Sequence, residues 1–383
     1  MKVLLLYDYP PPPGGLATQG ELLHQGLHEI GVEAHATNIE SVIEKEWYYR
    51  WFHPDVVLGV GYWGKTPQVV LHPHQFGMTA VPWLVADGYI ANYQDILNSL
   101  PLILVTSHWV KEVYTRDGIR PEIIEVLPVG CDTDRFIPYP VEDPKVAAVR
   151  RTFGVGPEEL MILTVGGDAA SKGGREVMEA LAKLKPSERG GHAWKYICKV
   201  WPQERTTKQN QLDQALVKHL GISTRVTYST DRISRDLMPF LLSACDIYAA
   251  PSRLEGFGMT QVEAGACGKP VLSLAAMGML DTLVHNETAL LAGIAKKNYI
   301  HETTLGPEDG FPMQRHITFD PPRIADYRAD VNDLRLHLGA LMRDPDLRRR
   351  LGEAGRRRVV EHFDYRTVAK QFVEILKRRL DIP

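Results

Sequence analysis

The sequence lacks the features that mark secreted, metal-binding or membrane-spanning proteins. It has four cysteines among 383 residues, and no two of them are spaced as a CxxC pair. This excludes a dense disulfide framework and a thiolate metal centre, and it fits a reduced, cytoplasmic setting. The apolar start from Met1 to Leu6 is too short for a signal peptide, and no later run approaches the roughly 20 apolar residues of a membrane-spanning helix. We therefore expect a buried first strand and no transmembrane segment.

A strong excess of one charge is also missing. The chain has 44 Lys and Arg residues against 47 Asp and Glu residues, a net charge of -3. Proteins that bind nucleic acid usually show a clear basic excess, so we expect no nucleic acid as a partner. Two arginine runs, 348–350 and 356–358, lie in a tail, 333–380, with helical periodicity. Such runs usually form a solvated helix face, and peripheral contact with an anionic membrane is the alternative. The sequence does not indicate an oligomeric state.

A GxGxxG fingerprint is absent after the first strand, where a proline run and Gly14-Gly15 stand instead. That absence argues against a nicotinamide-dependent oxidoreductase. Short aliphatic runs nevertheless alternate with longer amphipathic stretches, which predicts parallel strands joined by crossover helices. Since 383 residues exceed what one hydrophobic core supports, we predict an α/β protein of two Rossmann-like, doubly wound parallel-sheet domains. The predicted strands are 3–6, 56–60, 102–106, 161–165, 196–200, 225–228, 247–250 and 271–274.

Two irregular stretches interrupt this rhythm. Residues 137–144 hold three prolines and show no periodicity, as expected of a linker. We place the domain boundary there, with a first domain at 1–140 and a second at 145–364. Residues 293–326 contain several prolines and glycines and are too long for an ordinary connection. We expect that stretch to be a functional loop or a mobile insertion.

The segment 251–270 carries the strongest chemical signal. It follows the predicted strand 247–250 and passes through glycines into a helix, so free backbone N–H groups gather where a doubly wound sheet binds ligands. A helix amino terminus with its unpaired donors suits a phosphate. Glu255 lies before this helix and Glu263 lies within it. The alternative is a glycine-rich turn whose Glu255 favours the helix start, with Glu263 a surface residue, but an unpaired Glu263 would be costly to bury among its small apolar neighbours.

This segment resembles the Glu-x7-Glu signature of family 4 of the retaining glycosyltransferases, which have the GT-B fold of two Rossmann-like domains facing a cleft. The resemblance covers nearly the whole chain. It implies that Glu255 contacts the donor sugar and Glu263 the ribose of the nucleotide. It also implies that the first domain holds the acceptor and is completed by the final helix, 365–383, while the second domain holds the nucleotide sugar. The same loop adds four residues to the expected donor site: Gly256, Phe257, Gly258 and Met259.

A second block, 164–175, joins a predicted strand to a helix through Gly166 and Gly167. A lysine after such a glycine turn can meet a diphosphate as a compact charge. By resemblance, Lys172 is the family lysine that stabilises the leaving diphosphate; alone it could equally be a solvated lysine at a helix start. Many relatives carry an arginine where this chain has Gly167. Lys199 is therefore a candidate for the second cation, and a strand lysine that extends to the sheet edge is the equal alternative.

The first half adds three candidate residues. Gly14 and Gly15 resemble the family's amino-terminal glycine loop and would let the backbone approach a donor phosphate closely. Many family members have a histidine after the strand that reads 81–86, and this chain has Asp87 there. Asp87 could accept a hydrogen bond from the acceptor hydroxyl or the donor sugar, or it could form an Asx-type turn. The sequence favours neither of these two roles for Asp87.

The function expected from this reading is transfer of a hexosyl group, with retention, from a UDP- or GDP-linked sugar to a hydroxyl acceptor. Glu255, Lys172 and Asp87 are the expected catalytic residues. No metal and no cofactor beyond the nucleotide sugar is expected, because the sequence shows no metal-ligand cluster. The alternatives are a retaining glycosyl phosphorylase of the same fold and a catalytically inactive protein that binds sugar nucleotides.

Overall fold

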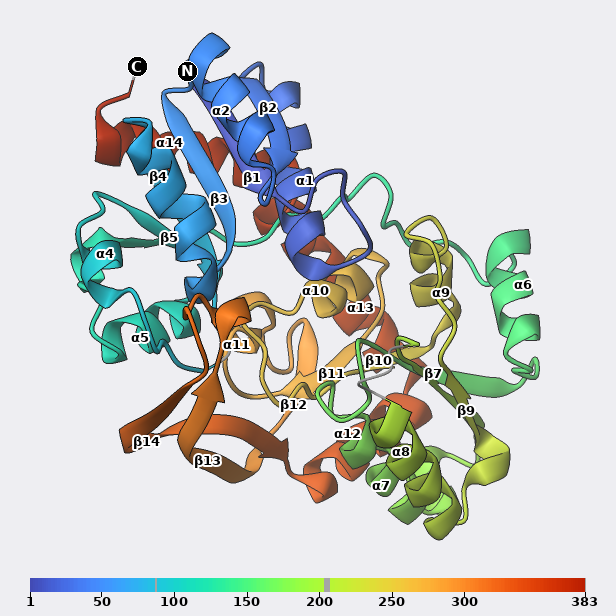
Figure 1. The fold of residues 1–383 in the computed structure, drawn as a ribbon. Coiled ribbons are helices and arrows are strands. Elements are labelled where there is room, and N and C mark those ends of the chain that lie inside the picture. The colour runs from blue at the N-terminus through green and yellow to red at the C-terminus, as the bar shows by residue number, and fades with distance from the viewer. Residues whose placement is uncertain (87, 203–206, 383) are drawn as a thin grey trace. The chain divides into compact units, whose positions relative to one another are not determined.

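The computed structural model describes residues 1–86, 88–202 and 207–382. The chain divides into two compact units (Figure 1). Unit 1 comprises residues 1–132, 299–325 and 362–383, and unit 2 comprises residues 133–298 and 326–361. Each unit has its own sheet and its own core, and each is described separately.

Unit 1 is built on a six-stranded parallel sheet with the order β2-β1-β3-β4-β5-β6. Strand β1 reads KVLLLY and buries its last five residues, as expected of a parallel sheet with both faces covered. Helix α1 packs closely against the final helix, α14, because Gly26 has no side chain. A Cβ there would lie 2.7 Å from the carbonyl oxygen of Tyr365.

The elements of unit 1 alternate strand and helix along the chain. Its strands are β1 (Lys2–Tyr7), β2 (Glu33–Asn38), β3 (Val56–Tyr62), β4 (Ala80–Val85), β5 (Ile103–Val105) and β6 (Ile124–Val126). Its α-helices are α1 (Gly15–Glu29), α2 (Val42–Trp51), α3 (His72–Gln75), α4 (Gln94–Asn98), α5 (His108–Arg116) and α14 (Tyr365–Leu380).

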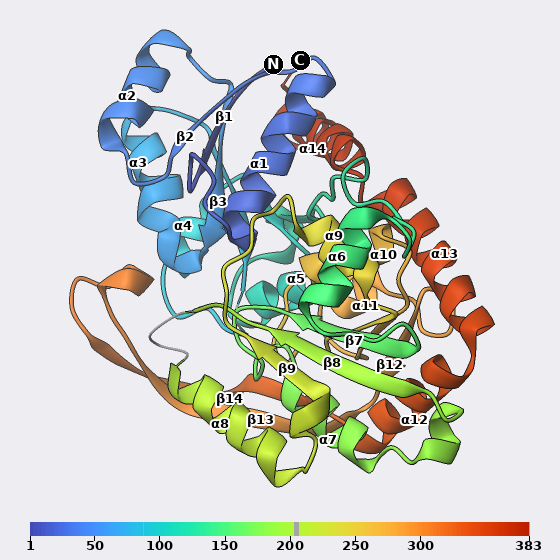
Figure 2. The ribbon, with the colours of Figure 1, turned by 90° about the vertical axis from the view of Figure 1, so that its right-hand side faces the viewer.

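Unit 2 is built on a second six-stranded parallel sheet, with the order β12-β11-β10-β7-β8-β9. In Figure 2, β7, β8 and β9 lie side by side, with α7 and α8 on one side of them and α6 and α9 on the other. Strand β7 reads ELMILTV and buries six of its seven residues. The two-sided burial again explains the continuous apolar run.

The elements of unit 2 follow the same alternation. Its strands are β7 (Glu159–Val165), β8 (Ala193–Lys199), β9 (Val226–Ser229), β10 (Ile247–Ala249), β11 (Val271–Leu274) and β12 (Ala289–Ala292). Its helices are α6 (Pro144–Thr152), α7 (Gly174–Lys183), α8 (Thr207–His219), α9 (Met238–Ala244), α10 (Met259–Ala266), α11 (Met279–Thr282), α12 (Val331–Arg343) and α13 (Pro345–His362).

Both sheets have a topological switch point, where the strand order reverses and ligands bind beyond the carboxyl ends of the strands. In chain order, the sheet of unit 2 reads 3-2-1-4-5-6, the Rossmann order, and its switch point lies between β7 and β10. The sheet of unit 1 begins 2-1-3-4-5, the flavodoxin-like order, and its switch point lies between β1 and β3. The predicted fold class, two Rossmann-like parallel-sheet domains, is confirmed.

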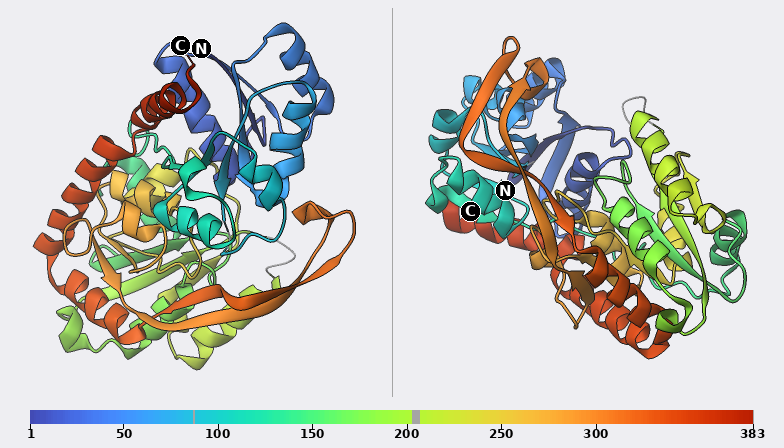
Figure 3. Two further views of the ribbon diagram at one scale, coloured as in Figure 1. Left: turned by 90° about the vertical axis from the view of Figure 1, so that its left-hand side faces the viewer. Right: turned by 90° about the horizontal axis from the view of Figure 1, so that it is seen from below.

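The stretch 293–326 is not the irregular loop that the sequence suggested. It forms most of a long β-hairpin of β13 (Ile294–Leu305) and β14 (Arg315–Ala329), drawn as the orange ribbon in Figure 3. The prediction was wrong because both strands are rich in exposed charged and polar residues, which gives no clean alternation of apolar and polar positions. The distal part of the hairpin, 299–325, belongs to unit 1, and its base belongs to unit 2.

The chain passes from unit 1 to unit 2 between Asp132 and Thr133, before the proline-rich stretch 137–144. Phe136 is fully buried, and the guanidinium of Arg356 donates to the carbonyl oxygens of Thr133 and Phe136. This packing holds the residues just before the predicted linker against α13, and the linker itself lies within unit 2. Residues 362–383, with α14, lie in unit 1.

In the arginine runs of the tail, Arg349, Arg350 and Arg357 are exposed, as expected of a solvated face, whereas the other three are partly buried. Arg348 donates to the carbonyls of Leu341 and Met342, and Arg358 donates to those of Asp281 and Thr282. These guanidinium groups fasten α13 to its own unit and are not free to meet a lipid surface. Across the residues that the structure describes, no helix combines the length and the apolar character needed to cross a membrane.

Candidate functional site

The loop that follows β7 places Lys172 at the switch point of unit 2. The side chain folds back over Gly166, where a Cβ would lie 2.2 Å from Cγ of Lys172. The carboxylate of Asp168 accepts the N–H of Ser171 at 2.6 Å and so closes a turn just before the lysine. Gly173 has a φ of +72°, and a Cβ there would lie 2.2 Å from the carbonyl oxygen of Pro251. Glycine is therefore required both before and after Lys172. Gly166 leaves room for the lysine side chain, and Gly173 leaves room for the loop that contains Pro251.

The loop between β10 and α10 places Glu255 beside that lysine. Lys172 Nζ donates to Glu255 Oε2 in an ion pair, with the two side chains 24% and 16% exposed. Helix α10 begins after Gly258, whose φ is +91°, and no side chain caps its first turn. Its first backbone N–H groups and the positive end of its dipole therefore point towards the same loop as the ion pair. A cation, an acid and an uncapped helix amino terminus gather at this switch point.

A third loop supports Glu255 and was not predicted from the sequence. It follows β11 and contains Met277, which has a φ of +59° although it is not a glycine. The N–H of Glu255 donates to Sδ of Met277 at 3.3 Å, and the N–H of Gly278 donates to the carbonyl of Glu255 at 3.2 Å. Left-handed backbone at a bulky residue is costly and tends to persist where the surroundings fix it, often near functional sites. The sequence carried no signal for this loop.

Glu263 lies in α10, half-buried, one turn beyond the start of the helix. Burial raises the pKa of its carboxyl to about 7, against the opposing effect of the Arg235 and Arg135 guanidinium groups. Both arginines belong to unit 2. At neutral pH this acid is divided between its charged and neutral forms, and it can accept or donate a hydrogen bond.

Lys199 ends β8 and pairs in register with Val165, the last residue of β7. Its side chain is only 3% exposed, and burial lowers the pKa of its ammonium. Within the described parts of the chain this ammonium has no hydrogen bond or ion pair, although Asp231 favours its charged form. Gly166 and Gly167 lie next to it, since the N–H of Gly166 donates to the carbonyl of Lys199.

The remaining predicted residues lie elsewhere. Gly14 precedes α1 and Gly15 begins it, in the loop after β1 of unit 1. A Cβ at Gly14 would meet nothing within 4 Å, so the structure leaves that position open. Asp87 lies outside the described residues. In the loop after β10, Phe257 is buried and Met259 is half-buried.

A buried ion-pair cluster beside the loop between β10 and α10 was also missed. Arg253 donates through Nε and Nη2 to Glu176 Oε1 at 3.0 and 2.7 Å, and each side chain is 9% exposed. Arg328 Nη1 reaches the same oxygen at 3.4 Å. The N–H of Arg253 donates to the carbonyl of Ser171 at 2.8 Å, which joins the Glu255 loop to the Lys172 loop. The signal in the sequence was an acid, Glu176, on the apolar face of α7, where it needs a cationic partner.

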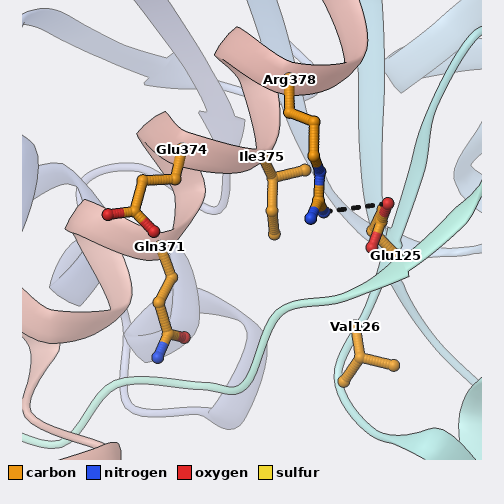
Figure 4. A pocket seen from close by; sticks show the side chains of 6 residues that line it. All are labelled: Glu125, Val126, Gln371, Glu374, Ile375 and Arg378. Carbon is orange, nitrogen blue, oxygen red and sulfur yellow. Dashed lines mark ion pairs between the residues drawn. The ribbon is translucent and has the colours of Figure 1, made fainter.

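A separate groove lies at the free edge of the sheet in unit 1, away from its switch point (Figure 4). It has a volume of about 400 Å³ between β6 and α14. An ion pair of 3.0 Å between Arg378 and Glu125 crosses it. Its lining residues are Glu125, Val126, Gln371, Glu374, Ile375 and Arg378. No three His, Cys, Asp or Glu side chains in the described part of the chain gather where they could hold a metal ion.

Comparison with known proteins places a family match on unit 2. Residues 147–302 match the family model of the group 1 glycosyl transferases. The MMP alpha-(1->4)-mannosyltransferase of Mycolicibacterium hassiacum is 28% identical over 294 residues, 76% of this chain and 58% of that protein. The mannosylfructose-phosphate synthase of Agrobacterium fabrum is 29% identical over 216 residues, 55% of this chain and 46% of that protein. The chain thus spans about half the length of these curated relatives.

A solved structure extends the similarity of fold to nearly the whole chain. Anabaena Alr3699/HepE in complex with UDP and glucose superposes with a TM-score of 0.74 at 16% sequence identity, covering 99% of this chain and 100% of that one. At that identity the likeness concerns the fold alone. The sequence match to the group 1 glycosyl transferases falls on the part of the chain that holds Lys172, Glu255 and Glu263.

Proposed function

We propose that this chain is a retaining glycosyltransferase of family 4 that moves a hexosyl group from a UDP- or GDP-linked sugar to a hydroxyl acceptor. The observation that carries the proposal is the Lys172–Glu255 ion pair at the switch point of unit 2, beside the uncapped start of α10. The match of residues 147–302 to the group 1 glycosyl transferases supports it. The names of the two curated relatives, a mannosyltransferase and a mannosylfructose-phosphate synthase, agree with it.

The ion pair suggests how the donor enters. In this structure the ammonium of Lys172 is balanced by Glu255, and neither charge is fully buried. A diphosphate carries more charge than one carboxylate, so Lys172 would transfer its interaction to the diphosphate when the donor binds. Glu255 is then released to accept hydrogen bonds from sugar hydroxyls. The amides of 256–260 add neutral donors aimed at the phosphates.

Bond breaking would then be promoted by charge already in place. As the bond between the anomeric carbon and the phosphate oxygen breaks, negative charge grows on the diphosphate, and Lys172 and the helix dipole stabilise it. The acceptor oxygen bonds to the anomeric carbon on the same face, and its proton passes to the leaving phosphate oxygen. Lys199 would supply the second cation, because it ends β8 next to Gly166 and Gly167, within the loop that carries Lys172. Glu263 would bind the ribose.

Two alternatives share most of this geometry. A glycosyl phosphorylase would use inorganic phosphate in place of the nucleotide. An inactive protein would bind the sugar nucleotide without turnover. The absence of an arginine at Gly167 is the observation that keeps the inactive alternative open. All four cysteines are buried free thiols, which agrees with the cytoplasmic setting that we propose.

The test is calorimetry with UDP and GDP, followed by transfer from UDP-glucose and GDP-mannose to a panel of hydroxyl acceptors. We expect one nucleoside diphosphate to bind and the transfer product to keep the anomeric configuration, which NMR of the product determines. Activity should survive treatment with EDTA. Turnover that needs inorganic phosphate would identify a phosphorylase, and binding of neither nucleotide would refute the proposal.

A further inference from the structure

The distal part of the β13–β14 hairpin is built into the core of unit 1. Leu305 and Phe311 are 6% and 4% exposed and pack in the same apolar cluster as residues of β1, β3, β4 and β5. Phe311 meets the ring of Trp63, which follows β3, at 6.5 Å between centroids. The hairpin is therefore fixed at this end by burial of apolar surface and is not a free arm.

The turn of the hairpin, 306–311, contacts the loops after β3 and β4. The hydroxyl of Tyr93 donates to the carbonyl of Gly310, and that of Tyr62 donates to the carbonyl of Glu308. Gly310 has a φ of +78°, and a Cβ there would lie 2.7 Å from Tyr93 Oη and 2.8 Å from the carbonyl oxygen of Gly64. Tyr93 itself has a φ of +68°. The turn thus fits against these loops in one position only.

A closed circuit of contacts joins β14 to the segment 88–93. Tyr89 packs on the ring of Phe319 at 4.9 Å, and the guanidinium of Arg323 lies 5.4 Å from that same ring. Arg323 then forms an ion pair of 2.8 Å with Asp117, whose side chain is 1% exposed. The other oxygen of Asp117 accepts the N–H of Ile90, the residue after Tyr89, at 2.8 Å.

The base of the hairpin makes the corresponding contacts in unit 2. The N–H of Tyr327 donates to the carbonyl of Arg253 at 2.8 Å, two residues before Glu255. Arg328 shares the carboxylate of Glu176 with Arg253. One element therefore contacts a carboxyl-end loop of unit 1 at its distal end and the Glu255 loop of unit 2 at its base.

We propose that the β13–β14 hairpin is a positioning element for both substrates. Its distal end holds the segment 88–93 for the acceptor through Arg323. Its base holds the 251–258 loop for the donor through the N–H of Tyr327, which donates to Arg253, and through Arg328, which shares Glu176 with Arg253. This proposal rests on the proposed function, which gives the acceptor to unit 1 and the donor to unit 2. The two arginines act through the loops that they hold and contact no substrate themselves.

The distal contact is tested with Arg323→Ala. Hydrogen exchange in peptides covering 88–93 should rise at least about fivefold, because the variant opens the circuit through Asp117 and Phe319. UDP and GDP should bind within about twofold of the wild-type affinity. With UDP-glucose or GDP-mannose as donor and the hydroxyl acceptor of the panel that supports turnover, the KM for the acceptor should rise and that for the donor should not. Arg323→Lys keeps the charge opposite Asp117 and should restore part of the protection.

The basal contact is tested with Arg328→Ala, which should give the opposite pattern. Nucleoside diphosphate binding should weaken by about threefold or more, and exchange in 88–93 should stay at the wild-type level. The matched control is Glu302→Ala. This residue lies on the exposed face of the hairpin, paired with His316 at 3.2 Å and 66% exposed. It should change neither readout.

Circular dichroism and a thermal melt establish that each variant is folded. Equal exchange in 88–93 for Arg323→Ala and Glu302→Ala would overturn the distal half of the proposal, and unchanged nucleotide binding in Arg328→Ala would overturn the basal half. If the wild-type chain binds neither UDP nor GDP, the proposed function fails. The exchange comparison at 88–93 still decides whether the hairpin holds that segment.

Discussion

The switch points of the two sheets are held together by different chemistry. In unit 2, between β7 and β10, the loops meet through charges: Lys172 pairs with Glu255, and Arg253 with Glu176. In unit 1, the turn after β3 is covered by the aromatic ring of Phe311. An ion pair does occur near that turn, between the side chains of Lys65 and Glu40, but these are 32% and 55% exposed, where screening by water leaves such a pair little energy.

This difference indicates what each site can recognise. Partly buried charges that pair only with each other can be exchanged for a charged ligand at little net cost, which suits a diphosphate. The loops after β3 and β4 of unit 1 are held by the hairpin of the same chain, through rings, through tyrosine hydroxyls that bond to carbonyls, and through the Arg323–Asp117 ion pair. We infer that unit 1 presents a fixed shape to the acceptor. The predictions below test the charged side of the contrast first.

Removal of Lys172 should have the largest effect. Lys172→Ala leaves Glu255 without its cation and the diphosphate without its compact charge. Loss of one such transition-state contact typically costs on the order of a hundredfold or more in rate. Steady-state transfer and calorimetry with the nucleoside diphosphate measure the change. Lys183→Ala, at the exposed far end of α7, is the matched control, and kinetics equal to that control would place the diphosphate elsewhere.

Substitution of the two glutamates should affect ligand binding and transfer differently. Glu255→Gln should depress transfer and leave binding of the free nucleoside diphosphate nearly intact, because that product has no sugar for Glu255 to contact. Glu263→Gln should weaken nucleotide and nucleotide sugar alike, by roughly 1.5–3 kcal/mol, as is typical of a hydrogen bond to a charged group. Calorimetry with both ligands on both variants distinguishes the two. Equal losses everywhere would mean that the pair only stabilises the loop.

Glu263 should also make stability depend on pH. Its pKa is raised from 4.5 to about 7 in the folded protein. The native state therefore holds this proton more tightly than the unfolded chain. Its contribution to the free energy of unfolding is complete below about pH 4.5 and is lost as the pH rises through about 7.

Glutamine has no proton to lose at this position. The difference between the free energies of unfolding of Glu263→Gln and of the wild type should accordingly shift in favour of the variant, by on the order of 1–3 kcal/mol, as the pH rises from 5 to about 8. Urea unfolding of both proteins at several pH values measures the difference. A difference that stays constant with pH would show that the carboxyl is not perturbed by folding.

The comparison of the two units also explains which parts of the fold and of the site could be predicted from the sequence. The parallel sheets were predictable because buried strands such as β1 and β7 are continuous apolar runs. The proximity of Lys172 and Glu255 followed from a general rule, since each residue follows a strand that borders the switch point. Both parts depend on local patterns that any parallel sheet imposes.

The supporting contacts were not predictable for a physical reason. Met277 contacts Glu255 directly, and Arg328 contacts Glu176, the partner of Arg253; no local pattern links either position to Glu255. The hairpin was not predicted because its two strands pair with each other and bury few side chains. The buried Leu305 and Phe311 lie at the end of β13 and in the turn. Contacts between segments that are distant in sequence produce no periodic pattern of residue types, so they can be identified only in the folded structure.

The smallest effect, and a gain, is expected at Gly167. This position holds glycine where the resemblance to family 4 implies an arginine. Among the described residues, a Cβ there would have only the Trp201 ring within 4 Å, at 4.0 Å, and the backbone is not in the left-handed region. Gly167→Arg should therefore fold and place a further cation at the switch point, beside the buried ammonium of Lys199.

The added guanidinium should strengthen binding of the nucleoside diphosphate by about threefold to tenfold, since a charged contact in a partly open site retains roughly 1 kcal/mol after the loss of side-chain entropy. Gly167→Gln, which adds a polar chain without a charge, is the matched control. The gain should shrink as salt is raised from 0.05 to about 0.5 M, because screening weakens exposed charges first. A gain that the glutamine variant shares, or one that does not respond to salt, would show that packing rather than charge is responsible. The switch point of unit 2 would then already hold as much positive charge as its ligand can use.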